Sequence, residues 1–228
     1  MQITWLGHSG FRIEIEDAVL LIDPWLTGNP MFPENRRAEA IANTTHVLMT
    51  HGHGDHSADA GAVATELGVP LVSIYDLIAN FDAPAGVENI GFNKGGTVDL
   101  GGAKVTMVNA CHSSTLNGAA AGSEAGFMIA GEGHVIYLSG DTDIMADMGW
   151  MGEYHKPDIG ILSCGGHFTM DMKRAAFAAR KYFNFKTVIP CHYRTFPLLE
   201  QDAGALKSGL PGVQVIEPEV LIPIVLQT

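Results

Sequence analysis

The sequence predicts a mixed α/β fold with a large buried core. Of the 228 residues, 46% are hydrophobic and 17% are charged, a composition that globular domains have and disordered chains lack. Segments with the two-residue alternation of β-strands occur beside segments with helical periodicity. The 27 glycines indicate many tight turns. The length suits one domain covering 1–228, or two small halves that share a core.

The first half of the chain is predicted to begin with short strands joined by tight turns and then to alternate strands with helices. The predicted strands are residues 3–6, 11–15, 18–22, 47–49, 71–74 and 101–109. The predicted helices are residues 57–67, which end at Gly68, and residues 76–80. Pro and Gly make residues 23–30 a loop.

The second half repeats this arrangement with one long helix. The predicted strands are residues 127–129, 135–139, 159–163 and 187–190, with 213–216 and 221–225 closing the sheet. The helix covers about 172–183 and has Thr169 or Asp171 as its cap. The Ala- and Gly-rich segment 117–126 is predicted to be the crossover between two halves of the domain, roughly 1–116 and 117–228.

Charge and composition exclude several classes of protein. The formal net charge of −12 repels phosphate backbones and argues against a nucleic-acid partner. A small anionic substrate stays compatible, because local cations can outweigh a distant field. The first residues lack the pattern of a signal peptide, and no apolar run reaches the roughly 20 residues that span a bilayer. With three cysteines and no C-x-x-C spacing, we expect a cytoplasmic setting without a membrane partner.

The most informative motif is the run His51-Gly52-His53-Gly54-Asp55-His56. Imidazole and carboxylate groups are the ligands expected for zinc or a similar first-row ion. The two glycines allow a sharp backbone turn, so that side chains from one short loop can converge on a small volume. The motif also lies between a predicted buried strand and a helix, where a rigid frame would hold a metal site.

Three further candidate ligands follow the ends of other predicted strands. His112 follows the strand that ends near residue 109, Asp141 follows 135–139, and His192 follows 187–190. Side chains just beyond the ends of separate strands can meet at one edge of a sheet, where α/β folds tend to place their sites. A single His or Asp in such a position is more often structural, so the argument depends on the recurrence.

The motifs resemble the metallo-β-lactamase superfamily of hydrolases, and in particular an uncharacterised metal-dependent branch similar to the ascorbate-6-phosphate lactonase group. The segments that carry the resemblance are residues 4–9 (TWLGHS), 22–24 (IDP), 50–56 (THGHGDH), 139–142 (SGDT) and 168–170 (FTM). One segment departs from the pattern. Related sequences commonly have an aspartate and an asparagine where this chain has residues 164–167 (CGGH).

The resemblance implies a four-layer αβ/βα sandwich with two divalent metal ions along one edge. Three histidines would bind the first ion, namely His51, His53 and His112. Asp55, His56 and His192 would bind the second, and Asp141 would bridge both. Two such cations, about 3.5–4 Å apart, can lower the pKa of a shared water toward roughly 7 and so generate hydroxide. Asp55 could orient that nucleophile or accept its proton.

Several residues near the proposed site keep alternative interpretations. His8 lies in a turn that the resemblance places over the mouth of the site, where substrate contact and turn packing are equally compatible with the sequence. His167 could contact substrate, and Arg194 could pair with an anionic group or form a surface ion pair. Asp23 could hydrogen-bond a ligand histidine. Cys111 and Cys191 each precede a candidate ligand and are expected to be buried.

We therefore expect a metal-dependent hydrolase that acts on a small lactone, ester or phosphate-bearing substrate. Zinc fits the His-rich, thiolate-free ligand set, with manganese or iron as alternatives. A phosphodiesterase or nuclease on the same scaffold would need a basic track. A non-catalytic metal or ligand sensor would have a closed, fully coordinated site. The expected partner is a small-molecule substrate, and a homo-oligomer is compatible with the sequence.

Overall fold

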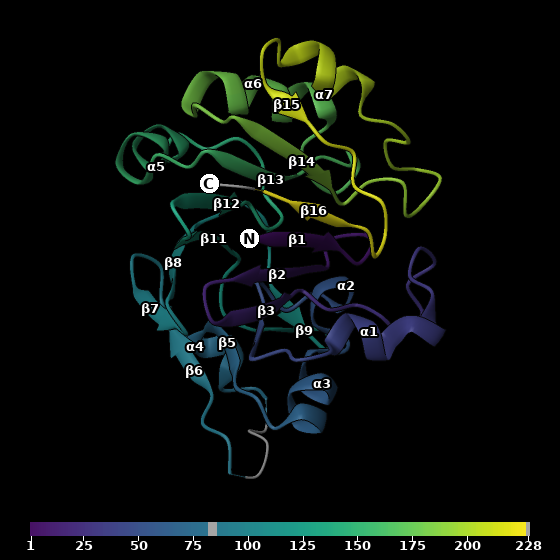
Figure 1. Cartoon of the computed structure of the whole chain (residues 1–228), viewed down its shortest axis with the longest axis vertical. Coiled ribbons are helices and arrows are strands. Elements are labelled where there is room, and N and C mark those ends of the chain that lie inside the picture. The colour runs from purple at the N-terminus through teal and green to yellow at the C-terminus, as the bar shows by residue number, and fades with distance from the viewer. Residues whose placement is uncertain (82–85, 227–228) are drawn as a thin grey trace.

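Two β-sheets and the helices outside them make up the fold in the computed structural model, which describes residues 1–81 and 86–226 (Figure 1). Within this described part, the first sheet has seven strands, in the spatial order β16 (Pro223–Val225), β1 (Gln2–Trp5), β2 (Phe11–Ile15), β3 (Ala18–Ile22), β4 (His46–Leu48), β5 (Leu71–Ile74) and β6 (Ile90–Phe92). The strands from β16 to β3 are antiparallel, whereas β3, β4, β5 and β6 are parallel.

The second sheet also has seven strands among the described residues. Their spatial order is β15 (Gln214–Val215), β14 (Thr187–Cys191), β13 (Ile159–Ser163), β12 (His134–Leu138), β11 (Ala125–Gly131), β8 (Ala103–Asn109) and β7 (Thr97–Leu100). A small hairpin lies apart from both sheets and consists of β9 (Thr115–Leu116) and β10 (Ala119–Ala120).

The helices lie on the outer sides of the sheets, which confirms the predicted αβ/βα sandwich (Figure 1). Beside the first sheet are η1 (Glu34–Arg36), α1 (Arg37–Ile41), α2 (Gly54–Ser57), α3 (Ala60–Leu67) and α4 (Tyr75–Ile78). Beside the second sheet are α5 (Met148–His155), α6 (Met172–Tyr182) and α7 (Gly204–Gly209). Asp171 caps α6, because its side chain accepts a hydrogen bond from the Arg174 backbone N–H at 2.7 Å.

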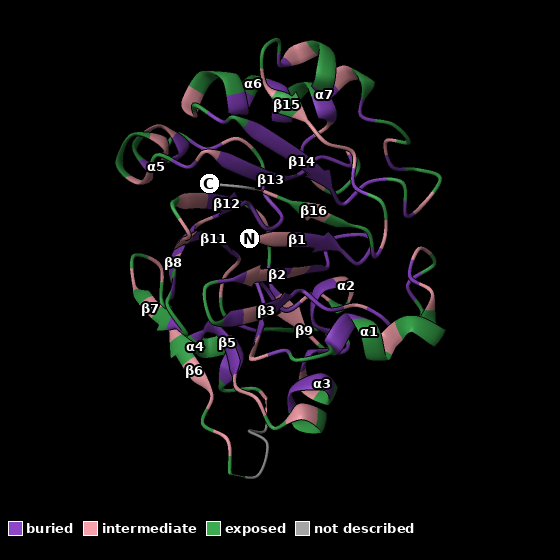
Figure 2. Cartoon of the chain, viewed as in Figure 1, coloured by how far each residue is buried: buried purple, intermediate pink, exposed green. Residues whose placement is uncertain are grey.

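The core lies between the sheets, whose central strands are mostly buried, whereas the edge strands β6, β7, β15 and β16 are partly exposed (Figure 2). The β2 strand alternates buried and partly exposed residues, whereas β5, β13 and β14 are buried throughout, as expected for parallel strands covered on both faces. Phe92 of β6 stacks on Phe127 of β11 with 6.4 Å between ring centroids. This contact joins the two sheets directly.

Three expectations about the fold need correction. The helix expected over 57–67 is two helices, and α2 starts at Gly54, inside the histidine motif. The two last strands do not close one sheet, because β15 lies at the edge of the second sheet and β16 at the edge of the first. The chain crosses between the sheets before β7, not at 117–126, so the sheets do not coincide with the predicted halves 1–116 and 117–228. The division into halves stays a prediction.

Strand direction brings many loops to one edge of the sandwich. In the first sheet β3, β4 and β5 run parallel. In the second sheet β8 and β12 are both antiparallel to β11 and therefore run the same way, and β12, β13 and β14 are parallel. The carboxyl ends of β4, β8, β12 and β14 are continued by the segments that hold the candidate ligands.

One of these strand ends leaves no room for a side chain. Gly165 follows β13, and a Cβ atom there would overlap the backbone carbonyl oxygen of His192. Gly165→Ala is therefore expected to lower the free energy of unfolding by about 1–3 kcal/mol, as measured by urea denaturation. Gly149→Ala is the control, since a Cβ there would lie 3.7 Å from the Tyr182 ring, an ordinary contact. Equal stability of the two variants would contradict the close approach of these strand ends.

Candidate metal centre

The histidine motif forms a tight turn between β4 and α2. His51 follows β4, and Asp55 and His56 lie in the first turn of α2. The turn packs against the β9–β10 hairpin so closely that a Cβ at Gly52 would lie 2.8 Å from the Thr115 carbonyl oxygen. Glycine at this position therefore allows the turn and the hairpin to meet.

Three histidines form the first group of metal-competent side chains, namely His51, His53 and His112. His51 Nε2 lies 3.0 Å from His53 Nδ1. The His112 ring lies 5.3 Å from the His51 ring and 5.2 Å from the His53 ring, between centroids. His51 is fully buried, whereas His53 and His112 are partly exposed. One histidine of this group is therefore held in the core, whereas solvent can reach the other two.

The second group contains His8, Asp55, His56 and His192, with Asp141 next to the last two. Asp55 Oδ2 lies 3.6 Å from His192 Nε2 and 3.9 Å from His56 Nε2. Asp141 Oδ2 lies 3.1 Å from His192 Nε2 and 3.4 Å from His56 Nε2. Ligand atoms around a tetrahedral ion with bonds of about 2.0–2.1 Å lie about 3.3 Å apart. The distances between these atoms therefore fit a first-row cation bound by Asp55, Asp141 and the two histidines.

Asp141 is close to both groups. Its Oδ2 atom is also 3.6 Å from Nε2 of His112, a member of the first group. Asp141 Oδ1 and His56 Nε2 are buried and make no hydrogen bond with any described residue. Buried polar atoms without a partner are rare in proteins, because leaving them unpaired is costly. These atoms fit a site whose remaining partner is a cation.

The charges of this cluster shift the pKa values of its members in opposite directions. Burial opposes ionisation of Asp141, but His192 and His56 outweigh burial and hold its pKa well below the usual range. Burial likewise opposes protonation of His192, but Asp141 and Asp55 outweigh it and raise the pKa to about 9. Burial lowers the pKa of His51 well below its usual value. Ionised carboxylates and neutral imidazoles are the forms that bind metal ions.

A buried carboxylate orients the motif from behind. Asp23 follows β3, and its Oδ2 accepts a hydrogen bond from His56 Nδ1 at 2.8 Å. Its two oxygens also accept bonds from the backbone N–H and the hydroxyl of Thr50, each at 2.7 Å. A hydrogen bond to a candidate ligand was one of the two roles that the sequence allowed for Asp23, the other being to hold its loop. With Nδ1–H held by Asp23, Nε2 is the nitrogen of His56 that could bind a cation beside Asp141.

His8 contacts a candidate ligand and is fully buried. Its Nε2 lies 2.9 Å from Asp55 Oδ2, and its Nδ1 lies 2.8 Å from the Thr195 hydroxyl. Burial lowers the pKa of His8 to about 4, so the ring is neutral at pH 7. Since a carboxylate only accepts, Nε2–H donates to Asp55 and the Thr195 hydroxyl donates to Nδ1. Thr195 had no signal in the sequence, because only tertiary packing brings it to His8.

The other two residues predicted to contact substrate, Arg194 and His167, are both exposed. Arg194 is exposed and lines a different hollow, together with Trp5, Met31 and residues 217–220. His167 is exposed, with its ring 4.6 Å from the ring of Phe168. Cys191 is buried as expected, but Cys111 is exposed, because its strand has ended at Asn109 and the chain runs on the surface.

An open cleft leads to the candidate ligands. It is lined by His53, Asp55, His112, Ser113, Asp141, Phe168, His192 and Phe196. Sequence reasoning did not select Ser113, Phe168 or Phe196 as site residues, although Phe168 follows β13 at the same edge as the ligands. The cleft is where a substrate could reach the centre.

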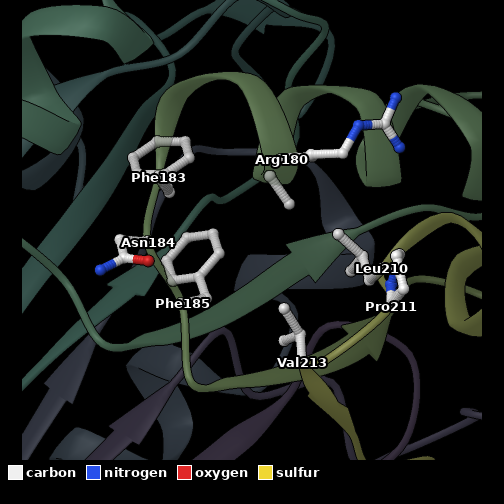
Figure 3. A pocket seen from close by; sticks show the side chains of 8 residues that line it. Arg180, Phe183, Asn184, Phe185, Leu210, Pro211 and Val213 are labelled. Carbon is white, nitrogen blue, oxygen red and sulfur yellow. The ribbon is translucent and has the colours of Figure 1, made fainter.

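A separate hollow lies between the end of α6 and β15 (Figure 3). Its wall is mainly apolar, with Phe183, Phe185, Leu210 and Val213 around it. Arg180, at its rim, donates a hydrogen bond to the Gly209 carbonyl oxygen at 2.8 Å. This hollow therefore has none of the metal-competent residues of the cleft.

Comparisons with known proteins agree with the geometry. A model of the β-lactamase superfamily domain matches residues 2–192. A UPF0173 metal-dependent hydrolase of Cereibacter sphaeroides is 73% identical over 228 residues, which cover 98% of this chain and 99% of the relative. Igni18, a metallo hydrolase from Ignicoccus hospitalis, has a TM-score of 0.83 and 31% identity, with 99% of each chain covered.

A more distant structure supports the fold alone. The metallo-β-lactamase fold protein YhfI from Bacillus subtilis has a TM-score of 0.76 and 16% identity, with 98% of each chain covered. The similarity to the ascorbate-6-phosphate lactonase group stays a prediction. With the family model, the close relatives and the His/Asp clusters in agreement, the chain belongs to the metallo-β-lactamase superfamily and is a metal-dependent hydrolase.

Proposed function

We propose that this hydrolase uses two divalent cations to cleave a small lactone, ester or phosphate-bearing substrate. The observation that carries the proposal is the position of Asp141 Oδ2, which is 3.1 Å from His192 Nε2 and 3.6 Å from His112 Nε2. One carboxylate oxygen thus lies within reach of both groups of nitrogen ligands. His51, His53 and His112 would hold one cation, Asp55, His56 and His192 the other, and Asp141 both.

The chemistry of the donor set supports zinc first, with manganese or iron as alternatives. The candidate ligands are imidazoles and carboxylates, and the cysteines are not among them. When bound, a pair of such cations lowers the pKa of water and stabilises negative charge on the attacked and departing oxygens. The residues of the chain supply the position of these charges and the shape of the cleft.

Asp55 has the best position for orienting the attacking water. It lines the cleft, and its side chain is 31% exposed. Burial opposes its ionisation, but His56, His192 and His8 outweigh burial and hold its pKa well below the usual range. So weak a base accepts a proton poorly at neutral pH, but it can accept a hydrogen bond. Of the two roles expected for Asp55, we therefore favour orientation.

Two alternatives have less support. A purely structural metal centre would be closed, whereas His53, Asp55 and His112 line an open cleft. A nuclease would need basic residues along the nucleic-acid backbone, and no Lys or Arg is found among the described residues that line the cleft.

A cytoplasmic setting and a homo-oligomer stay predictions. In the described ranges, no helix combines the length and apolarity that crossing a bilayer requires.

Changing a single shared ligand tests the two-cation proposal. Asp141→Asn is expected to lower the bound metal from two equivalents toward one and to reduce kcat/KM by at least about 100-fold. Plasma mass spectrometry gives the metal content, and circular dichroism verifies folding. His155→Ala is the control, because His155 lies at the end of α5, outside the cluster. Two equivalents and full activity in Asp141→Asn would contradict the proposal.

After removal of the metal, the free energy of unfolding should depend on pH in opposite directions above and below pH 6.5. In chelator-treated protein, His192 has a pKa of about 9 and binds a proton more tightly folded than unfolded. Its contribution to stability is therefore lost as pH rises from 6.5 to 9. His8, with a pKa of about 4, acts in the other direction and destabilises the fold as pH falls from 6.5 to 4.

Urea midpoints across this pH range would measure both slopes. His192→Gln should flatten the slope above pH 6.5, and His8→Gln the slope below it. Zn²⁺ and protons compete for the same nitrogens, so added Zn²⁺ should make stability rise with pH above 6.5. If Zn²⁺ leaves the slope above pH 6.5 unchanged, His192 is not a ligand.

A further inference from the structure

The cleft has an aromatic wall on one side of the candidate ligands. Phe168 is 51% exposed, and its ring centroid lies 6.3 Å from that of His192. The ring of Phe196 lies 5.8 Å from the ring of His8 and 6.1 Å from that of Trp25. Both phenylalanines line the cleft. They therefore offer apolar surface beside Asp55 and His192, where a bound substrate would cover it.

Other residues that line the cleft are polar, among them His53, Asp55 and Ser113. The Ser113 hydroxyl lies 3.4 Å from His53 Nε2, and His53 and Asp55 also line an adjoining hollow beside the β9–β10 hairpin. The aromatic and the polar residues of the lining can thus contact different parts of one small molecule. The apolar part would lie against the phenylalanines, and the polar part would face the adjoining hollow.

Cations suited to an anionic substrate group are not found in this part of the structure. Among the described residues that line the cleft and the adjoining hollow, none is Lys or Arg. Arg174 lies 3.1 Å and 3.2 Å from the two carboxylate oxygens of Asp143. Arg194 lies over the Tyr193 ring and lines a different hollow. Proteins usually recognise phosphate with Arg or Lys, so a phosphate group in this cleft would have to be bound by the metal ions alone.

We propose that the substrate is an uncharged ester or lactone with an apolar acyl or alcohol part, and that Phe168 and Phe196 determine this specificity. Small-molecule sites typically combine apolar walls with a few polar groups that fix orientation. The cleavage itself rests on the proposed function, whereas recognition of the apolar part rests on the wall alone. In the cleavage, the hydroxyl of water joins the carbonyl carbon, the bond between that carbon and the alcohol oxygen breaks, and the departing oxygen takes the remaining proton of the water. No further reactant is needed.

A series of substrates that differ in the length of the apolar part tests the proposal. With metal-loaded protein, kcat/KM is expected to rise at least about tenfold from 4-nitrophenyl acetate to 4-nitrophenyl octanoate. The kcat/KM for 4-nitrophenyl octanoate should also exceed the kcat/KM for 4-nitrophenyl phosphate. Phe168→Ala and Phe196→Ala should each reduce the ratio of octanoate to acetate hydrolysis several-fold while leaving two metal equivalents bound. Phe177→Ala is the matched control, because Phe177 is an exposed phenylalanine on α6, outside the cleft, and should leave the ratio unchanged.

A binding measurement separates this inference from the proposed function. Saturation-transfer NMR would compare 2-butanone with 2-undecanone, two neutral ketones that cannot be hydrolysed. Preference for the longer ketone, lost in Phe168→Ala, would support the aromatic wall even if no ester were cleaved, in which case only the proposed function would fail. Preference for the phosphate ester, or a chain-length dependence that survives in both phenylalanine variants, would overturn the inference.

Discussion

The buried carboxylate of Asp141 is the constraint around which the site is organised. Its side chain is 3% exposed, and an isolated buried carboxylate costs several kcal/mol. The nitrogens of His56, His112 and His192 surround it at 3.1–3.6 Å. These partners come from loops of both sheets, so compensation of the Asp141 charge requires both sheets to be in place. The packing between the sheets therefore keeps the histidine nitrogens around the buried charge of Asp141.

Hydrogen bonds behind the candidate ligands come from segments that are far apart in the chain. Asp23 joins the end of β3 to Thr50 and His56. His8 joins the turn after β1 to Asp55 and Thr195, and its backbone carbonyl accepts a bond from the His192 N–H at 2.9 Å. These contacts limit the rotation of the side chains that face the cleft. Orientation of this kind is what a metal site gains from its outer neighbours.

Much of the fold and the candidate ligand set could be predicted because the signals are local. The run from His51 to His56 carries its own turn chemistry, and His112, Asp141 and His192 each follow a strand that alternation or apolarity makes visible. Contacts that depend on tertiary packing could not be predicted. No local pattern pairs His8 with Thr195 or turns Arg194 away from the cleft. The assignment of β15 and β16 to different sheets depends on long-range pairing, which leaves no short-range pattern.

The distribution of the candidate ligands over the two sheets has a mechanical consequence. The loop after β4 in the first sheet contributes His51 to His56, whereas His112, Asp141 and His192 follow strands of the second sheet. An ion bound by ligands from both sheets would link the two sheets to each other. Parting the layers would then require its release, so dissociation of the ion and global opening would be one event with a single barrier. Slow exchange of a firmly held ion would in turn protect the core from transient opening.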